Sequence, residues 1–435
     1  MLIGLVRKLV DIRSDKELRG MLWATAYGFF ILFGYYILRA VRDEISAADR
    51  GNLQVLWTVV FFTMIGAVWL YSTVASRFSR GVFVPLANRF FIACLLGFWA
   101  ALVFLPETTR PWIDRVFYVW SSVFALFVVT VFWGFVSDCF DNNQGKRLFG
   151  FIAVGSSIGG IAGSAVTSYL ATRVPVFSLL LLAAVPLEVA SWFARMLHRH
   201  FGTGTVTTPG GAESPLLGTG LSGMRAVFRS RYLLNIAGFI ALMTFASTIL
   251  YFQQAHLVGE AIPDRGQRTA LLARIDLVVN ILTIVFQVYL TARIIRWLGV
   301  GITLAAVPAA VTLGFLGLGV YPTLAVLVVV QVAYRAGRYG MAKPAREVLF
   351  TVVGREEKYK SKAFLDAAVY RGGDLVSGWI YAGLAAVGLS VGGIALAAMP
   401  LAVVWGILGL RLGQREEVLA AALPTVTGEP VAAIP

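Results

Sequence analysis

Charged residues are scarce in this sequence: Asp, Glu, Lys and Arg make up 14% of its 435 residues, whereas 58% are hydrophobic. Soluble domains average about 25% charged and about 45–50% apolar residues. The mean hydropathy is +0.78, and apolar runs long enough to cross a bilayer recur along the chain. Together these features predict an all-α membrane protein that crosses the bilayer many times.

Cysteine and histidine are scarcer still. The two cysteines, Cys94 and Cys139, lie in or beside apolar runs and form no disulfide framework, and the three histidines lack the spacing of metal ligands. Residues 218–223 match the pattern GxGxxG, but no strand precedes them, so we assign them to a linker. No Ser or Cys has a plausible base beside it. The sequence therefore predicts no enzyme, no cofactor and no metal site.

Acidic residues are outnumbered, with 23 Asp and Glu against 37 Lys and Arg, and the net charge is +14. Such a charge suggests nucleic acid or anionic lipid as a partner. Most Lys and Arg, however, fall in the segments that face the cytoplasm if both termini lie there. This positive-inside pattern makes nucleic acid an unnecessary partner. It predicts an integral protein of the bacterial inner membrane, with the lipid bilayer around it and both termini in the cytoplasm.

Twelve apolar segments form two groups of six. The first group comprises 21–38, 53–75, 82–105, 116–136, 148–171 and 174–194, and the second 233–252, 270–292, 299–320, 322–342, 363–387 and 389–410. The predicted parts of the chain are an amphipathic interfacial helix (1–20), an N-terminal half (21–200), a cytoplasmic linker (201–232), a C-terminal half (233–413) and a disordered tail (414–435). We expect the chain to act as a monomer.

A faint internal repeat relates the two halves. Arg77 and Arg80 precede a Gly turn after the second segment, and Arg293 and Arg296 precede one after the eighth. Parallel six-helix halves of this kind build major-facilitator transporters, whose substrate site lies between the halves. Arginines that flank cytoplasmic helix ends are common, so a chance match is the alternative.

Basic residues inside the tenth segment suggest an anion path. Gln331, Arg335 and Arg338 share one helical face, and Arg335 lies roughly 20 Å from the segment's start near Pro322. One Arg near the bilayer centre costs about 2.5–3.5 kcal/mol, so two on one face predict a lined cavity. Arginine forks match phosphate or carboxylate oxygens. The alternative is that both side chains snorkel to the cytoplasmic surface.

Other charged residues extend this candidate site. At the end of the first segment, Tyr35, Arg39 and Arg42 have the same i, i+4, i+7 spacing as Gln331, Arg335 and Arg338. The alternative is that Arg39 and Arg42 mark the external end of the helix and face lipid headgroups. Arg371 and Asp374 are three residues apart and either pair with each other or serve the substrate. The candidate substrate-binding residues are Arg39, Arg42, Arg89, Arg335, Arg338, Tyr339, Arg346 and Arg371. The candidate gating or ion-pair residues are Asp43, Asp138, Lys146, Arg147, Glu347, Asp366 and Asp374, of which Asp138 with Lys146 or Arg147 would form a cytoplasmic latch.

Three stretches resemble a known family. The run Lys343-Pro-Ala-Arg346-Glu347, followed by the Lys-rich residues 357–366, is similar to the corresponding segment of the ATP/ADP translocases. Residues 38–43 resemble the end of that family's first helix, and residues 132–135 together with 146–149 resemble its fourth-to-fifth helix junction. The resemblance covers the membrane region in order.

The resemblance implies a major-facilitator-like antiporter that exchanges nucleotides such as ATP and ADP. The phosphate contacts would be Arg42, Arg335, Arg338 and Arg346, with an aromatic residue near the base. Gln144 replaces an expected Glu, no acid occurs in 249–253, and Arg replaces most of the family's Lys. Anion transport is therefore better supported than ATP/ADP exchange itself. The alternatives are a transporter of another anionic metabolite or lipid-linked anion, or a non-transporting sensor or scaffold with this fold.

Overall fold

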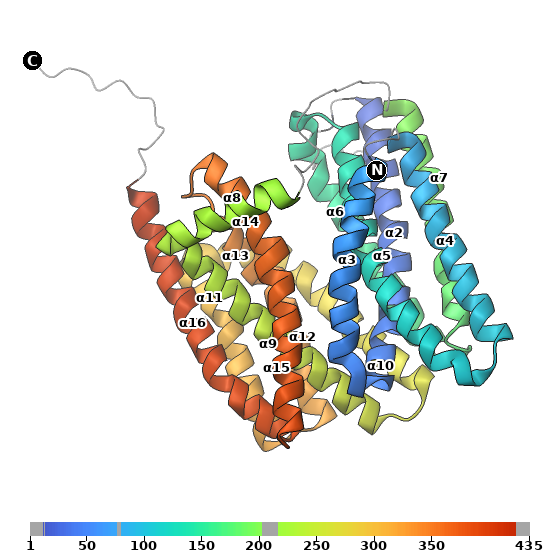
Figure 1. Cartoon of the computed structure of the whole chain (residues 1–435). Helices are drawn as coiled ribbons and strands as arrows, with labels where there is room; N and C mark the ends of the chain where they lie inside the picture. Colours follow the sequence, from blue (N-terminus) through green and yellow to red (C-terminus); the bar gives the residue numbers. More distant parts are fainter. Residues whose placement is uncertain (1–11, 13, 76–79, 202–215, 423–435) are drawn as a thin grey trace, which may run out of the picture.

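A computed structural model describes residues 12, 14–75, 80–201 and 216–422. In this part of the chain all regular structure is helical. Twelve membrane-spanning helical segments, each called a rod below whether it is one numbered helix or two, form two halves of six (Figure 1). The N-terminal half comprises α2 (Asp15–Ala48), α3 (Leu53–Ala75), α4 (Arg80–Phe104), α5 (Arg110–Cys139), α6 (Asn142–Leu170) and α7 (Ser178–Phe201). The C-terminal half comprises α9 (Arg231–Ala261), α10 (Arg265–Val285), α11 (Thr291–Val320), α12 (Leu324–Gly337) with α13 (Lys343–Val348), α14 (Arg355–Phe364) with α15 (Tyr370–Ala386), and α16 (Val391–Ala421).

Short irregular turns interrupt or join these rods. Three π-helical turns, η3 (Phe286–Leu290), η4 (Arg338–Ala342) and η5 (Leu365–Val369), lie inside the eighth, tenth and eleventh rods, and two 3₁₀ turns, η1 (Arg50–Asn52) and η2 (Glu107–Thr109), precede α3 and α5. Gly299 has a φ of 78°, a conformation that glycine adopts at little cost, and it separates the eighth rod from the ninth. This is the Gly turn that the sequence predicted there.

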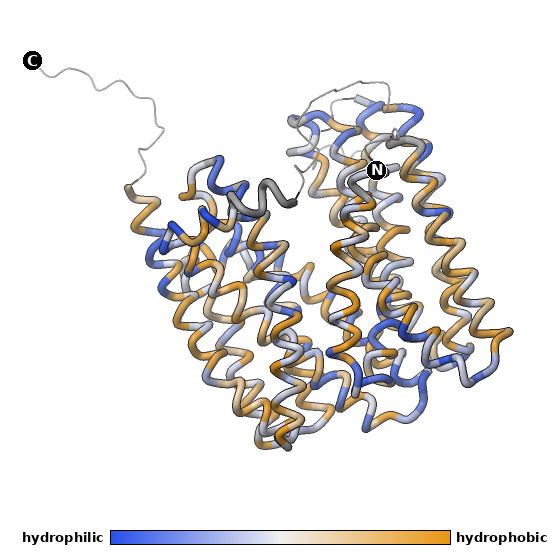
Figure 2. Tube along the Cα trace, viewed as in Figure 1, coloured by the Kyte–Doolittle hydropathy of each residue, from blue (hydrophilic) through white to orange (hydrophobic). Residues whose placement is uncertain are grey.

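The predicted membrane spans agree with helix length and composition. Nine described helical segments are long and apolar enough to cross a membrane, and one of these, Arg265–Val320, contains two successive rods. The remaining two rods, α12 with α13 and α14 with α15, miss that criterion because charged residues and π turns interrupt them. Hydrophobic residues cover the middle of the rods and hydrophilic residues gather toward their ends (Figure 2).

Polar side chains fix where several rods begin. Ser14 caps α2 by accepting a hydrogen bond from the Glu17 amide at 3.1 Å, and Thr323 caps α12 in the same manner. Asp141 and Gln144 form a reciprocal capping box at the start of α6. Gln144, the departure from the ATP/ADP translocase pattern, therefore has a helix-capping role in this chain.

Close helix packing holds the N-terminal half together. Gly155, Gly159 and Gly163 face α2, and a Cβ on Gly159 would lie 2.1 Å from the Phe29 carbonyl oxygen. This stripe of glycines thus allows α6 to approach the α2 backbone, as small residues do in membrane helix pairs.

The two halves meet mainly on one side of the molecule. We call the side where α2 begins and α16 ends the terminal side, and the opposite side the loop side (Figure 1). Helices α2, α3 and α6 of the first half pack against α9, α10 and α15 of the second. Between described residues, the hydrogen bonds and ion pairs that join the halves extend from Tyr36, near the middle of α2, to the loop side. The halves are thus closed together on the loop side.

Three parts of the predicted organisation need correction or fall outside the described residues. Residues 1–11 and 13 of the predicted interfacial helix (1–20) lie outside them, whereas its last residues, from Asp15 on, form the beginning of α2. The predicted linker contains a helix, α8 (Leu216–Arg229), which packs on α14, so residues 218–223 are helical. Helix α16 continues to Ala421, so the predicted tail does not begin at residue 414, and residues 423–435 lie outside the described part. The basic segment 355–362 forms part of α14 because its residues are good helix formers.

Candidate functional site

Arg338 lies at the centre of a cluster of hydroxyl groups. It begins the π turn η4, and its guanidinium donates hydrogen bonds at 3.0 Å to Ser247 Oγ of α9 and to the Tyr334 hydroxyl, and also to the Tyr370 hydroxyl of α15. The Tyr334, Tyr339 and Tyr370 ring centroids lie 5.4–5.8 Å from its Cζ atom. Among the described residues, no carboxylate lies within 4.0 Å of Arg338, so its charge is held by neutral groups.

The π turn at Arg338 is itself supported by the neighbouring rod. Gln287 donates a hydrogen bond to the Tyr339 carbonyl oxygen at 3.2 Å, and Thr291 donates one to the Gly340 carbonyl oxygen at 2.6 Å. These side chains come from η3 and the start of α11. They satisfy backbone groups that a wider helical turn leaves without regular partners, which is how such turns persist at functional sites.

A cavity of about 480 Å³ opens beside Arg338 within the C-terminal half, among α9, η4, α13, α14 and α15. Ligand sites typically occupy about 300–1,000 Å³. Its charged lining residues are Arg338, Lys343, Arg346, Lys362, Arg371, Glu347 and Asp366, with Tyr339 and Tyr370 among the others. Five cationic side chains therefore face two carboxylates, and the cavity is net positive.

The two carboxylates of the cavity, Glu347 and Asp366, form ion pairs with basic residues that line it. Lys362 Nζ lies 2.5 Å from Glu347 Oε2, and Arg346 lies 3.4 Å from Asp366 Oδ1 and 3.7 Å from Glu347 Oε1. These pairs tie α13 to α14 and η5 within one half. Glu347 and Asp366 thus form ion pairs, as the sequence analysis expected for them.

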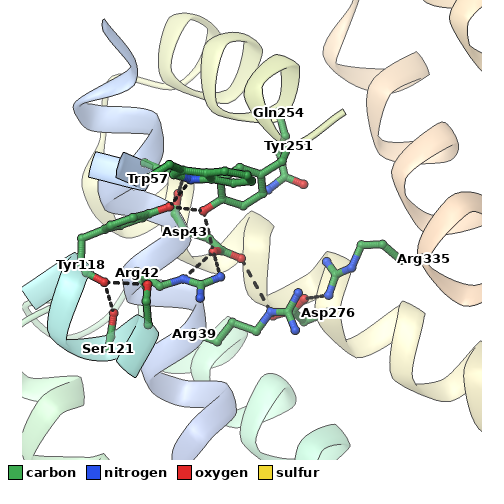
Figure 3. A network of polar contacts seen from close by, with 12 residues as sticks. Arg39, Arg42, Asp43, Trp57, Tyr118, Ser121, Tyr251, Gln254, Asp276 and Arg335 are labelled. Atoms are coloured by element: carbon green, nitrogen blue, oxygen red, sulfur yellow. Dashed lines mark hydrogen bonds and ion pairs between the residues drawn. The ribbon is translucent and has the colours of Figure 1, made fainter. Parts of the chain in front are cut away.

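A second charged cluster joins the halves deeper in the molecule (Figure 3). Asp43 Oδ1 accepts two hydrogen bonds from Arg42, at 2.8 and 3.2 Å, and Asp43 Oδ2 lies 3.7 Å from Arg39 Nε. Asp276 of α10 forms an ion pair with Arg335 and lies 3.3 Å from Arg39. Three guanidinium groups therefore surround two carboxylates, and one of these contacts, between Arg39 and Asp276, crosses from one half to the other.

Aromatic residues cover this charged cluster on its loop side. The Tyr251 hydroxyl of α9 donates to Asp43 Oδ1 at 3.1 Å and lies 3.2 Å from the Tyr118 hydroxyl of α5, which also accepts a 2.9 Å hydrogen bond from Trp57 Nε1 of α3 (Figure 3). These residues come from both halves. They close the path from the cluster toward the loop side.

Beyond the aromatic layer, a buried carboxylate joins the ends of the halves. Glu44 of α2 lies 2.9 Å from Arg265 and 2.6 Å from Arg268, both at the start of α10. Arg265 also makes two hydrogen bonds, at 2.9 and 3.0 Å, to Asp114 of α5. We call these four residues the loop-side clamp.

Several predicted site residues lie elsewhere. Arg89 lies 3.2 Å from Glu188, which also contacts Arg195, on the exposed surface between α4 and α7, so the expectation that it binds substrate is wrong by position. Asp374 accepts a 3.4 Å hydrogen bond from Thr248, and no ion pair within 4.0 Å joins it to Arg371 in the described part.

The predicted cytoplasmic latch falls only partly within the described residues. Arg147 lies 3.1 Å from Glu17 of α2, which also accepts a hydrogen bond from Gln144 at 3.1 Å. Asp138 lies exposed at the end of α5, and the side chain of Lys146 falls outside the described part. The described contact of Arg147 therefore ties α6 to α2 within one half.

Sequence reasoning missed the acids and hydroxyls that hold the arginines. The residues not anticipated are Glu44, Asp114, Ser247, Tyr251, Arg265, Arg268, Asp276, Tyr334 and Tyr370. One signal was available for Asp276, because an acid within the apolar eighth segment is costly unless it is paired. The hydroxyl groups gave no such signal, since Tyr and Ser are common in membrane helices.

Solved structures share this architecture. The chain is similar to the POT family transporter PepTSo, with a TM-score of 0.64 and 13% identity over 92% of this chain and 98% of that one. It is also similar to a bacterial homologue of the iron transporter ferroportin in an inward-facing state, with a TM-score of 0.65 and 12% identity over 93% of this chain and 100% of that one. The nucleoside transporter NupG matches with a TM-score of 0.62 and 15% identity over 94% and 98%.

The chain has the major-facilitator-type fold. No protein-family model and no curated protein matches it. Because the identities are only 12–15%, these similarities concern the fold alone. The substrate has to be inferred from the residues of the site.

Proposed function

We propose that the protein is a secondary antiporter that exchanges nucleotides or related phosphorylated anions across the membrane by alternating access. The solved proteins with this fold that are named above are transporters. The observation that carries the proposal is Arg338, a guanidinium without a carboxylate partner among the described residues, at a net-positive cavity of about 480 Å³.

The chemistry of the cavity favours phosphate over a single carboxylate. Arg338 has planar donors that match phosphate oxygens in a bidentate manner, and Lys343, Arg346 and Lys362 supply further positive charge along the same wall. A polyphosphate spreads several charges over such a row of cations. The rings of Tyr339 and Tyr370 provide flat apolar surfaces on which a nucleobase can stack.

The arrangement of the halves supports the transport cycle. Contacts between the halves lie toward the loop side, whereas the cavity lies by η4 and α13 toward the terminal side. With the terminal side assigned to the cytoplasm by the positive-inside rule, this conformation receives substrate from the cytoplasm. Substrate binding would neutralise the basic wall and let the halves close over it, after which the loop-side clamp opens.

Exchange in liposomes tests the proposal. Purified protein should catalyse counterflow of labelled ATP or ADP, and Arg338→Ala should reduce uptake at least about tenfold, because hydrogen bonds to charged groups contribute about 1.5–3 kcal/mol. Arg89→Gln, which alters an exposed pair on the outer surface, is the matched control and should transport normally. A folded wild-type protein that exchanges no nucleotide across a panel would rule out the nucleotide assignment.

A further inference from the structure

Asp276 is the one acid of the charged cluster that contacts arginines of both halves. It is 1% exposed within α10, and its Oδ1 atom accepts a hydrogen bond from Arg335 of the same half. Its Oδ2 atom lies 3.3 Å from Arg39 Nε of the other half, yet that oxygen has no hydrogen-bond partner in the described part of the chain. The contact across the halves is therefore electrostatic and imperfectly formed.

Arg39 is correspondingly free to bind another anion. Its described polar contacts are the ion pairs with Asp276 and Asp43, at 3.3 and 3.7 Å, and neither has the geometry of a hydrogen bond. Its guanidinium lies 5.7 Å from the ring centroid of Tyr36. A guanidinium has five N–H donors, so this largely enclosed group, whose side chain is 16% exposed, keeps much of its donor capacity unused.

Asp43 is held far more firmly than Asp276. Its Oδ1 atom accepts hydrogen bonds from Arg42 Nε, from Arg42 Nη2 and from the Tyr251 hydroxyl, at 2.8–3.2 Å. An incoming anion would have to break several good hydrogen bonds to replace Asp43. To displace Asp276 from Arg39 it would break no hydrogen bond, and to displace it from Arg335 it would break only one.

We propose that Asp276 occupies an anion subsite between Arg39 and Arg335, and that a phosphate group of the substrate displaces its carboxylate there. This inference deepens the proposed function and rests on it. In the empty protein, the Asp276 carboxylate keeps the two guanidinium groups together across the halves. A bound phosphate would replace this carboxylate: its negative charge would hold the same two guanidinium groups together, and their N–H groups would donate hydrogen bonds to its oxygens.

This arrangement makes Asp276 a competitor of the substrate. With Asp276 ionised, three arginines face two carboxylates, and an added phosphate experiences repulsion from a neighbouring negative charge. Asp276→Asn keeps the size of the side chain and removes that charge. In the Asp276→Asn protein, Arg39 and Arg335 would then bind a phosphate more tightly. Without substrate, no carboxylate would lie between these two arginines.

Pyrophosphate binding to the purified full-length protein tests this directly by isothermal titration. Asp276→Asn should lower the pyrophosphate dissociation constant at least about tenfold relative to wild type, the equivalent of about 1.4 kcal/mol. The matched control is Glu17→Gln, which neutralises a buried acid paired with Arg147 inside one half. This control should leave the dissociation constant unchanged.

The outcomes separate this proposal from the proposed function. Tighter binding by Asp276→Asn supports the subsite even if the wild type exchanges no nucleotide. Unchanged or weaker binding by a folded Asp276→Asn protein, or no pyrophosphate binding to either protein, overturns it. If Asp276→Asn does not fold, Arg335→Gln, which leaves two arginines with two carboxylates, should weaken binding at least about tenfold; a change under about threefold overturns the subsite.

Discussion

Removing the charge of Glu44 should open the loop side of the molecule. Glu44 is fully buried and lies between Arg265 and Arg268 of the other half. In Glu44→Gln the side chain keeps nearly the same shape, but it no longer carries the negative charge that holds the start of α10 against α2. We expect the population to shift toward the conformation in which the loop side is open.

The size of the shift follows from the partners that remain. Removing one partner of a buried ion pair typically costs about 3–5 kcal/mol. Here Arg265 keeps its two hydrogen bonds to Asp114, and Arg268 keeps those to the Ile262 and Pro263 carbonyl oxygens. The cost should therefore be smaller, about 2 kcal/mol, which corresponds to a roughly 30-fold change in the ratio of the two conformations.

Thiol labelling from the loop side measures this ratio. Leu272 of α10 is 3% exposed and packs against Ala47 of α2 across the halves, so a cysteine there is protected while the loop side is closed. Cys94 and Cys139 are first replaced by Ser. In Leu272→Cys protein, Glu44→Gln should then raise the rate of modification by a membrane-impermeant maleimide by about the same 30-fold factor when exchange between conformations is fast.

The control removes a comparable ion pair that does not join the halves. Asp49 lies 2.6 Å from Arg115 of α5, and both residues belong to the N-terminal half on the loop side. Asp49→Asn should leave the labelling of the introduced thiol at its original rate. Equal labelling rates in the Glu44→Gln and Asp49→Asn proteins would refute the assignment of Glu44 to a clamp between the halves.

Three further outcomes are expected. Arg338→Lys should retain some nucleotide counterflow but less than wild type, because Lys keeps the charge and loses the planar donors; counterflow equal to that of Arg338→Ala would show that charge alone has no role. Gly159→Ala should lower the melting temperature, since the added methyl group would lie 2.1 Å from the Phe29 carbonyl oxygen, at a cost of about 1–3 kcal/mol, whereas Gly150→Ala, with open space around it, should not. Arg89→Gln should leave nucleotide affinity unchanged, and a marked loss of affinity would return Arg89 to the site.

The rods were predictable because their cause is local. A run of about 20 apolar residues must form a helix in the bilayer, where every backbone polar group needs an internal partner. The charges in the tenth and eleventh rods did not prevent their recognition, since the apolar runs on either side remained readable. Where the helices end was less predictable: α16 extends well beyond its predicted end at 410, because a helix can continue past the membrane as long as its residues favour it.

The arginines of the site were predictable, but the residues that hold them were not. Arg335 and Arg338 were recognisable because a buried guanidinium is costly and therefore needs a reason. Their partners come from α9, α10 and α15, and a single sequence does not say which residues of distant helices meet. The error over Arg89 has the same origin, since its partner Glu188 lies on a helix that sequence spacing could not bring next to it.

The shared helical face of Gln331, Arg335 and Arg338 has a consequence that spacing alone did not reveal. Gln331 donates to Gln254 of α9, Arg335 reaches Asp276 of α10, and Arg338 reaches α9 and α15. One face of one rod therefore contributes both to the Arg338 site and to the cluster around Asp276. Because Arg335 and Arg338 lie within one turn of each other on this rod, an anion that draws Arg335 away from Asp276 also acts on the helix that carries Arg338. In the proposed exchange cycle, this arrangement would couple phosphate contacts in the cavity to the contact between the halves, so that the loaded protein reorients faster than the empty one.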